Sequence, residues 1–167
     1  LRAKPLPIQL PLGSEDSYKG IIDLLENKAW SFDGSLGAEP VEVAIPESEQ
    51  AKCREFRQSL IEKLAEMDDQ ILLPYLEGRE LTTAEIRGAL KRVTLANKGV
   101  PILCGSVLRN KGVQPLLDAI INYLPSPLDM PAIRATDLGG AEVARPASDE
   151  APFTALAFKV VSDPFVG

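Results

Sequence analysis

The chain has 167 residues, of which 45% are apolar, and it carries a formal net charge of −6 with no histidine. This length and apolar content suit one domain, or one and a half, with a buried core. The lack of histidine excludes Ser-His-Asp and Cys-His catalysis, and the acidic balance disfavours direct binding of nucleic acid, whose phosphates it would repel.

Neither a membrane span nor a metal site is predicted from the sequence. No apolar run is long enough to cross a bilayer, and the prolines within residues 1–13 are unlike the apolar core of a signal peptide. Cys53 falls in a predicted helix and Cys104 in a predicted buried strand. We therefore expect two reduced thiols that pack as small apolar side chains, and two cysteines without histidine do not make a zinc site.

The first part of the chain carries the alternating pattern of short strands. Pro7 and Pro11 place the first strand at a sheet edge, because proline donates no ladder hydrogen bond. Ile21-Ile22 favours a strand after Gly20, although this segment is also compatible with the start of a helix. The predicted strands cover residues 6–12, 20–25, 28–32 and 41–45, with a loop at residues 33–37.

A long amphipathic helix is predicted after Pro46, with Ser48 as its cap. Asp68-Asp69 indicates a kink or the start of a new helix, and Gly78 is expected to end it in the left-handed conformation. The apolar residues that share one face at helical spacing are Cys53, Phe56, Leu60, Leu64, Met67 and Ile71.

Three glutamates, Glu55, Glu62 and Glu66, lie on the opposite face of this predicted helix at spacings i, i+7 and i+11. On the residues alone, an ordinary solvated face is the favoured interpretation. A docking surface for a partner is the alternative.

A further helix is predicted to begin at a capping box, with Thr82 as cap and Glu85 reaching back to it. Its predicted inner face is apolar and its outer face basic, and Asn97-Lys98-Gly99 is expected to end it. The inner residues are Ile86, Leu90, Val93 and Leu95, and the outer ones are Arg87, Lys91 and Arg92.

Residues 100–124 are predicted to form a strand, a loop and a helix. The uncharged run from Val100 to Cys104 predicts a strand buried on both faces. The loop Gly105-Ser106-Val107-Leu108 follows it, and ligands of open α/β sheets bind where the chain leaves the carboxyl end of a strand. A tight packing turn is the alternative. The apolar face of the predicted helix comprises Val113, Leu116, Leu117, Ile120, Ile121 and Leu124.

Two further segments complete the chain. Residues 125–150 are predicted to form a linker, because neither the strand period of 2 nor the helix period of 3.6 is found beyond Met130. Residues 152–161 predict a strand, followed by a turn at Asp163-Pro164. Such a strand needs a partner, so we expect this tail to fray, to pack back, or to pair through its edge.

The stretch PILCGSVLRNKGVQPLLDAIINYLPSPLDMP closely resembles the last strand and helix of the GTPase domain in the elongation factor G family of translational GTPases. QLPLG, YKGIIDLLENKAW and SDEAPFTALAFKVVSDPFVG resemble the same family, in the same order. The resemblance implies an α/β chain with four parts. These are an inserted α+β subdomain (1–99), the last strand, guanine loop and helix of a P-loop GTPase core (100–130), a linker (131–150) and the truncated start of a β-barrel second domain (151–167).

The resemblance implies that Gly105, Ser106, Val107 and Leu108 form the guanine-recognition loop. Backbone N–H groups of Ser106 and Val107 would donate to the six-oxo group of guanine, and the Ser106 hydroxyl would brace the aspartate of the preceding base-reading motif. The family usually has alanine where Val107 stands. Because a keto oxygen accepts hydrogen bonds and the adenine amino group does not, fixed amides select guanine.

Other parts of a GTPase site do not occur in this sequence. It has no G-x-x-x-x-G-K-[ST] phosphate loop, and Asn97-Lys98-Gly99-Val100 and Asn110-Lys111-Gly112-Val113 both lack the aspartate of an N-K-x-D motif. We therefore expect no catalytic residue, metal or nucleotide cofactor on this chain by itself, and no GTP hydrolysis by it. The resemblance implies GTP or GDP with Mg²⁺ in the full-length protein.

The resemblance further implies a cytoplasmic ribosomal translocase, which couples GTP hydrolysis to movement of tRNA and mRNA. Its expected partners are the ribosome and the ribosomal stalk protein, the latter docking at Glu55, Glu62 and Glu66, with no membrane. A recycling paralogue, a ribosome-protection factor or peptide chain release factor three is the alternative within the same GTPase frame. Without the resemblance, the sequence predicts an acidic α/β module that binds a protein partner.

Overall fold

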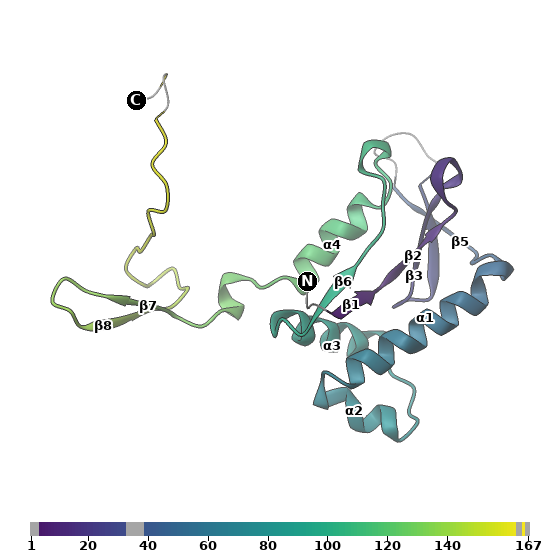
Figure 1. Ribbon diagram of the computed structural model, residues 1–167, viewed down its shortest axis with the longest axis horizontal. Coiled ribbons are helices and arrows are strands. Elements are labelled where there is room, and N and C mark those ends of the chain that lie inside the picture. The colour runs from purple at the N-terminus through teal and green to yellow at the C-terminus, as the bar shows by residue number, and fades with distance from the viewer. Residues whose placement is uncertain (1–3, 33–38, 163–164, 166–167) are drawn as a thin grey trace. The chain divides into compact units, whose positions relative to one another are not determined.

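The computed structural model describes residues 4–32, 39–162 and 165, and the chain divides into two compact units, Leu1–Leu124 and Pro125–Gly167 (Figure 1). The first unit mixes helices and strands, as the sequence predicts. Among the described residues, no helix is long and apolar enough to cross a membrane. The helices of the first unit are α1 (Glu47–Ala65), α2 (Asp69–Leu76), α3 (Thr83–Leu95) and α4 (Val113–Tyr123).

The predicted meander is confirmed as a four-stranded antiparallel sheet in the order β2-β3-β4-β5. The segment beginning at Gly20 is a strand, and Asn27 takes the left-handed conformation in the turn that follows it. The predicted loop at residues 33–37 lies outside the described residues. The strands are β2 (Gln9–Leu12), β3 (Gly20–Asp23), β4 (Lys28–Ser31) and β5 (Val41–Val43).

The predicted single strand at residues 6–12 is instead two strands that belong to different sheets. β1 (Lys4–Pro7) pairs in parallel with β6 (Gly99–Ile102), and β2 pairs with β3. Ile8 joins the sheets at the break, because its N–H donates to the Ile102 carbonyl at 3.0 Å and its carbonyl accepts from the Leu24 N–H at 3.0 Å. The alternating pattern did not reveal this change of partner.

The helix boundaries follow the predicted signals, except at the start of α1. Ser48 lies inside α1, and Pro46 occupies the cap position without a side-chain hydrogen bond, so the prediction of Ser48 as cap was wrong. Asp68 caps α2 by accepting from the Gln70 N–H at 3.2 Å. The capping box of Thr82 and the left-handed conformation of Gly78 are both confirmed.

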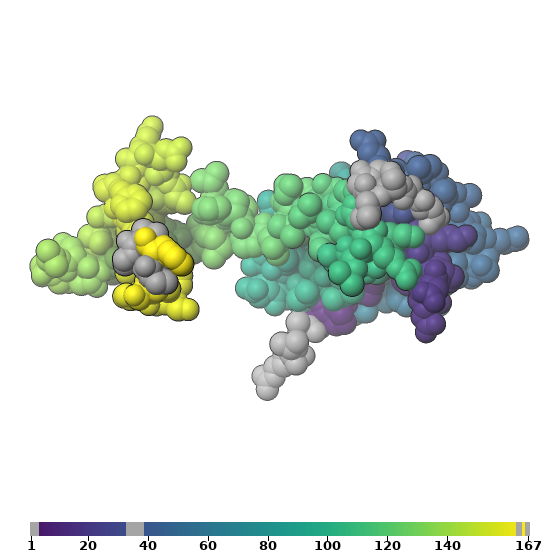
Figure 2. Space-filling model, turned by 90° about the horizontal axis from the view of Figure 1, so that it is seen from above, coloured from purple at the N-terminus to yellow at the C-terminus, as the bar shows by residue number. Residues whose placement is uncertain are grey.

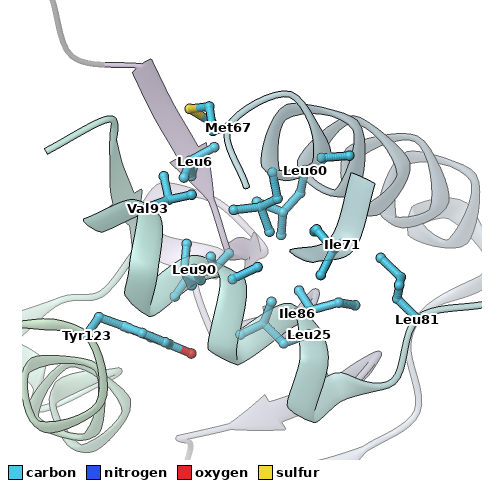
Figure 3. Packing of buried hydrophobic residues seen from close by; sticks show 14 of the residues in the cluster. Leu6, Leu25, Leu60, Met67, Ile71, Leu81, Ile86, Leu90, Val93 and Tyr123 are labelled. Atoms are coloured by element: carbon cyan, nitrogen blue, oxygen red, sulfur yellow. The ribbon is translucent and has the colours of Figure 1, made fainter. Parts of the chain in front are cut away.

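The main core lies where α1, α2 and α3 meet β1 (Figure 3). Leu6 from β1, Leu60 from α1 and Leu90 from α3 are almost completely buried there. A smaller cluster, which includes Leu10, Ile22 and Cys53, joins the other end of α1 to the meander. The predicted inner faces of α1 and α3 therefore form the core, with Phe56 and Leu95 only partly buried.

The predicted burial of β6 on both faces was wrong. Val100 and Ile102 are 45% and 42% exposed. Helix α4 instead buries Ala119 and Tyr123, at one flank of its apolar face, and most of that face is exposed in the part of the chain that the structure describes. Periodicity identifies the residues that share a face, but it does not identify what covers them. The exposed residues are Leu116, Leu117, Ile120, Ile121 and Leu124.

The second unit contains a hairpin where the sequence predicted a linker. β7 (Ile133–Thr136) pairs antiparallel with β8 (Glu142–Arg145) after the short helix η3 (Pro127–Asp129), so the prediction of an irregular linker between Met130 and residue 150 was wrong. Asp137 Oδ1 holds the turn by accepting from the N–H groups of Gly139 at 2.8 Å and Ala141 at 2.9 Å.

The predicted strand at residues 152–161 is not formed. This segment has no strand among the described residues, and Phe153 and Phe158 are 96% and 88% exposed. A strand forms only with a hydrogen-bonding partner, and no described strand pairs with this one. The predicted turn at Asp163-Pro164 lies outside the described residues.

We predict that the core residue Leu90 contributes strongly to stability. Leu90 is 0% exposed, so Leu90→Ala should lower the free energy of unfolding by about 2–5 kcal/mol through lost contacts and a cavity. Leu73→Ala is the matched control, because Leu73 is 63% exposed and its truncation should have a much smaller effect. Urea denaturation measures both changes, and equal effects would contradict this account of the core.

Candidate functional site

The loop at the carboxyl end of β6 is closed on itself by backbone hydrogen bonds. The Ser106 N–H donates to the Lys111 carbonyl at 2.8 Å, and the Lys111 N–H donates to the Ser106 carbonyl at 3.0 Å. Between them, Val107–Arg109 forms one short 3₁₀ turn, η2, and Asn110 adopts a left-handed conformation with φ of +50°. The loop is thus a defined structure, held at the point where the chain leaves the strand.

Two glycines allow the arms of this loop to touch. A Cβ atom on Gly105 would lie 2.8 Å from the Lys111 carbonyl oxygen, and one on Gly112 would lie 2.8 Å from the Cys104 carbonyl oxygen. Gly112 also has a positive φ of +79°, which favours glycine. The small residues therefore serve the closure of the loop, as the packing-turn interpretation expects, and not only the approach of a ligand.

The tip of the loop presents backbone donors to solvent. No described hydrogen bond uses the N–H groups of Val107 and Leu108, and these residues are 74% and 98% exposed. The predicted donor at Ser106 is instead occupied by the Lys111 carbonyl, and the Ser106 hydroxyl makes no hydrogen bond within the described residues. Of the two predicted guanine-reading amides, only that of Val107 is available in this conformation.

Residues of the meander hold the loop from one side. Gln9, at the start of β2, accepts the Cys104 N–H through Oε1 at 3.3 Å. The connection between β2 and β3, which includes the short helix η1 (Glu15–Ser17), lies beside the loop in the same unit. Arg109 pairs with Asp16 at 3.2 Å, and Lys111 Nζ donates to the Tyr18 carbonyl at 3.1 Å.

A cleft of about 550 Å³ opens between the β2–β3 connection and the loop, with Ser14, Tyr18 and Ser106 among its lining residues. Figure 2 shows the green surface of the loop and α4 beside the purple surface of the first strands. The cleft and the exposed amides are therefore neighbouring features of one end of the first unit.

Tyr18 and Cys104 are half-buried neighbours beside the loop. Burial and the neighbouring Cys104 raise the pKa of Tyr18 to about 12, and burial raises the pKa of the Cys104 thiol to about 11. The two side chains touch, but the Tyr18 hydroxyl makes no hydrogen bond of normal geometry. Sequence reasoning missed Tyr18, because nothing in its local pattern points to a contact almost ninety residues away.

The three predicted docking glutamates are all exposed on one part of the surface. Glu55 and Glu62 lie on α1, and Glu66 caps its end. Glu62 accepts from Gln58 Nε2 at 2.9 Å, and Glu66 pairs with Lys4 at 3.6 Å. Their exposure is compatible both with an ordinary solvated face and with a docking surface. The contact with Lys4 partly neutralises the charge of Glu66.

Both cysteines are free, as predicted, and no group of metal-ligating side chains occurs among the described residues. The candidate site therefore consists of backbone donors on a rigid loop. Such an arrangement can recognise an acceptor atom on a flat ligand and determine its orientation.

No model of a protein family matches the chain. Among solved structures, the chain is similar to a crystal structure of a protein from Thermus thermophilus, with 31% sequence identity and a TM-score of 0.63. The alignment covers 84% of this chain and 22% of the other. The mixed α and β fold is thus found within a much longer protein, and the chain corresponds to about a fifth of its length.

We predict that Gly112→Ala opens the loop. Alanine is unfavourable at the positive φ of Gly112, and its Cβ would lie 2.8 Å from the Cys104 carbonyl oxygen. Gly78→Ala is the matched control, because Gly78 has a similar φ of +71° but no atom within 4 Å of the added Cβ. Hydrogen exchange at the Ser106 and Lys111 amides should accelerate in the Gly112 variant only, and unchanged protection would refute the contact.

Proposed function

We propose that the chain is part of a translational GTPase of the elongation factor G type, in which the loop after β6 reads the guanine base. The observation that supports this most directly is the exposed pair of N–H donors at Val107 and Leu108, on a closed loop at the carboxyl end of a parallel strand. That is where open α/β sheets bind ligands.

The chemistry of the donors suits guanine and disfavours adenine. The six-oxo group of guanine accepts a hydrogen bond from a fixed N–H, whereas the amino group of adenine would face it with another donor. An unmatched donor in a water-excluded site costs free energy, so the discrimination is large when the donor cannot move. The Ser106–Lys111 hydrogen bonds supply that rigidity.

The uncovered apolar face of β6 and α4 supports the same proposal. Val100, Ile102, Leu116 and Ile120 are each at least 40% exposed in the described residues. In the proposed full-length protein, the remaining strands of a GTPase core would cover this face and supply the phosphate loop and the magnesium ligands. This chain by itself would then hydrolyse no GTP.

The proposed protein acts in the cytoplasm on the ribosome, where it couples GTP hydrolysis to tRNA and mRNA movement. Residues 151–167 would begin the β-barrel domain. The ribosome-protection factors and peptide chain release factor three are alternatives in the same GTPase class, and the SDPFVG and SPLDMP segments favour the translocase over them. A recycling paralogue is the other alternative, because the domains that distinguish it lie outside this chain.

We predict that Val107→Pro in the full-length protein weakens GDP binding about tenfold or more, as expected for one lost hydrogen bond to a desolvated acceptor. Proline removes the N–H but keeps the backbone shape, because Val107 begins a helical turn and Ser106 before it is extended. Val107→Ala is the matched control and should bind normally. Fluorescent GDP titration with ADP competition measures both, and equal affinities of the two variants would contradict the assignment.

We predict that reversing the charges of Glu55, Glu62 and Glu66 to lysine slows stalk-stimulated GTP hydrolysis by the full-length protein, most strongly at low salt. The reason is lost electrostatic attraction at an exposed helix face. Reversal of three exposed glutamates elsewhere provides a control of equal net charge: Glu77, Glu80 and Glu150.

An unchanged rate at low salt in the first variant would count against docking at α1. A full-length protein that binds the stalk but not GDP would instead favour the acidic docking module, for which the exposed glutamate face is the supporting observation.

A further inference from the structure

The Tyr18 side chain occupies an unusual position under the loop. Its hydroxyl oxygen is fully buried without a hydrogen-bond partner among the described residues, and a Cβ on Gly112 would lie 3.6 Å from it. A buried hydroxyl without a partner lowers stability, so its presence in a well-packed place needs a reason. The hydroxyl end of the Tyr18 side chain therefore lies next to Gly112, where the two arms of the loop touch.

The backbone around Tyr18 also holds the loop. Lys111 Nζ donates to the Tyr18 carbonyl at 3.1 Å, and Arg109 pairs with Asp16 at 3.2 Å. The pair with Asp16 is exposed and contributes little, whereas the bond to Tyr18 is partly buried. The β2–β3 connection therefore contacts the loop both from below and at its returning arm.

This connection is itself rigid. The Ser14 N–H donates to Ser17 Oγ at 3.1 Å, and Ser17 Oγ–H donates to the Ser14 carbonyl at 2.7 Å. The Lys19 N–H donates to the Leu12 carbonyl at 2.9 Å, which continues the β2–β3 ladder up to Tyr18. The backbone position of Tyr18 is thus held by hydrogen bonds within the meander and its β2–β3 connection.

We propose that Tyr18 is a positioning residue, whose ring keeps the loop Cys104–Gly112 closed and so aims the Val107 N–H. The effect on nucleotide binding rests on the proposed function, whereas the effect on the loop does not. Packing of the side chain, and not a hydrogen bond of its hydroxyl, carries the role, because the hydroxyl oxygen has no hydrogen-bond partner among the described residues. Tyr18→Phe should therefore preserve the loop, and Tyr18→Ala should open it.

The experiment uses the full-length protein and measures hydrogen exchange at the Ser106 and Lys111 amides together with the dissociation constant for fluorescent GDP. In Tyr18→Ala, we expect exchange to accelerate about tenfold and the dissociation constant to rise about tenfold. Tyr18→Phe should stay within about twofold of the wild type in both. Tyr75→Ala is the matched control, because Tyr75 lies on α2 and bonds Glu62, away from the loop.

The outcomes separate the two proposals. Exchange and affinity in Tyr18→Ala that match those of Tyr75→Ala would overturn the positioning role, as would an equal loss in Tyr18→Phe. A wild-type protein that binds no GDP would overturn the proposed function, while the exchange measurement still decides the role of Tyr18. If Tyr18→Ala does not fold, Tyr18→Leu applies the same test, since it keeps apolar bulk but fills less of the space.

Discussion

Parallel pairing of β1 with β6 is the constraint on which the first unit depends. It brings residues 4–7 beside residues 99–102, so that all of the intervening chain forms one long crossover. Gly99 makes the close approach possible, because a Cβ there would lie 2.7 Å from Leu6 Cδ1 and 3.0 Å from Val93 Cγ1. The core then forms where α1 and α3 pack over this pair of strands.

The same pairing places the meander next to the loop after β6. Ile8 turns the chain from one sheet into the other, and Gln9 immediately accepts the Cys104 N–H. The β2–β3 connection then carries Tyr18 beneath the loop. The candidate site therefore consists of backbone donors, and side chains of the meander support the loop that carries them.

The exposed face of β6 and α4 shows what a local sequence pattern can and cannot predict. The helical spacing in α4 correctly groups Leu116 and Ile120, yet the side that is covered carries Ala119 and Tyr123. The hairpin at Ile133–Thr136 was missed because four-residue strands give a weak alternating signal, and Asp137 decides the turn through its side chain. The contacts of Ala119 and Tyr123 join distant parts of the chain, whereas the Asp137 contacts are local but produce no periodic pattern.

The sequence by itself determined the helices, the meander, the capping box at Thr82 and the place of the loop, since these depend on hydrogen bonds and spacings within a few residues. Only the tertiary structure decided that β1 pairs with β6, that the Ser106 N–H is occupied, and that Tyr18 lies under Gly112. These contacts join residues that are close in space but distant in the chain. Packing and loop closure therefore determine which of these residues meet, and no local sequence pattern predicts that.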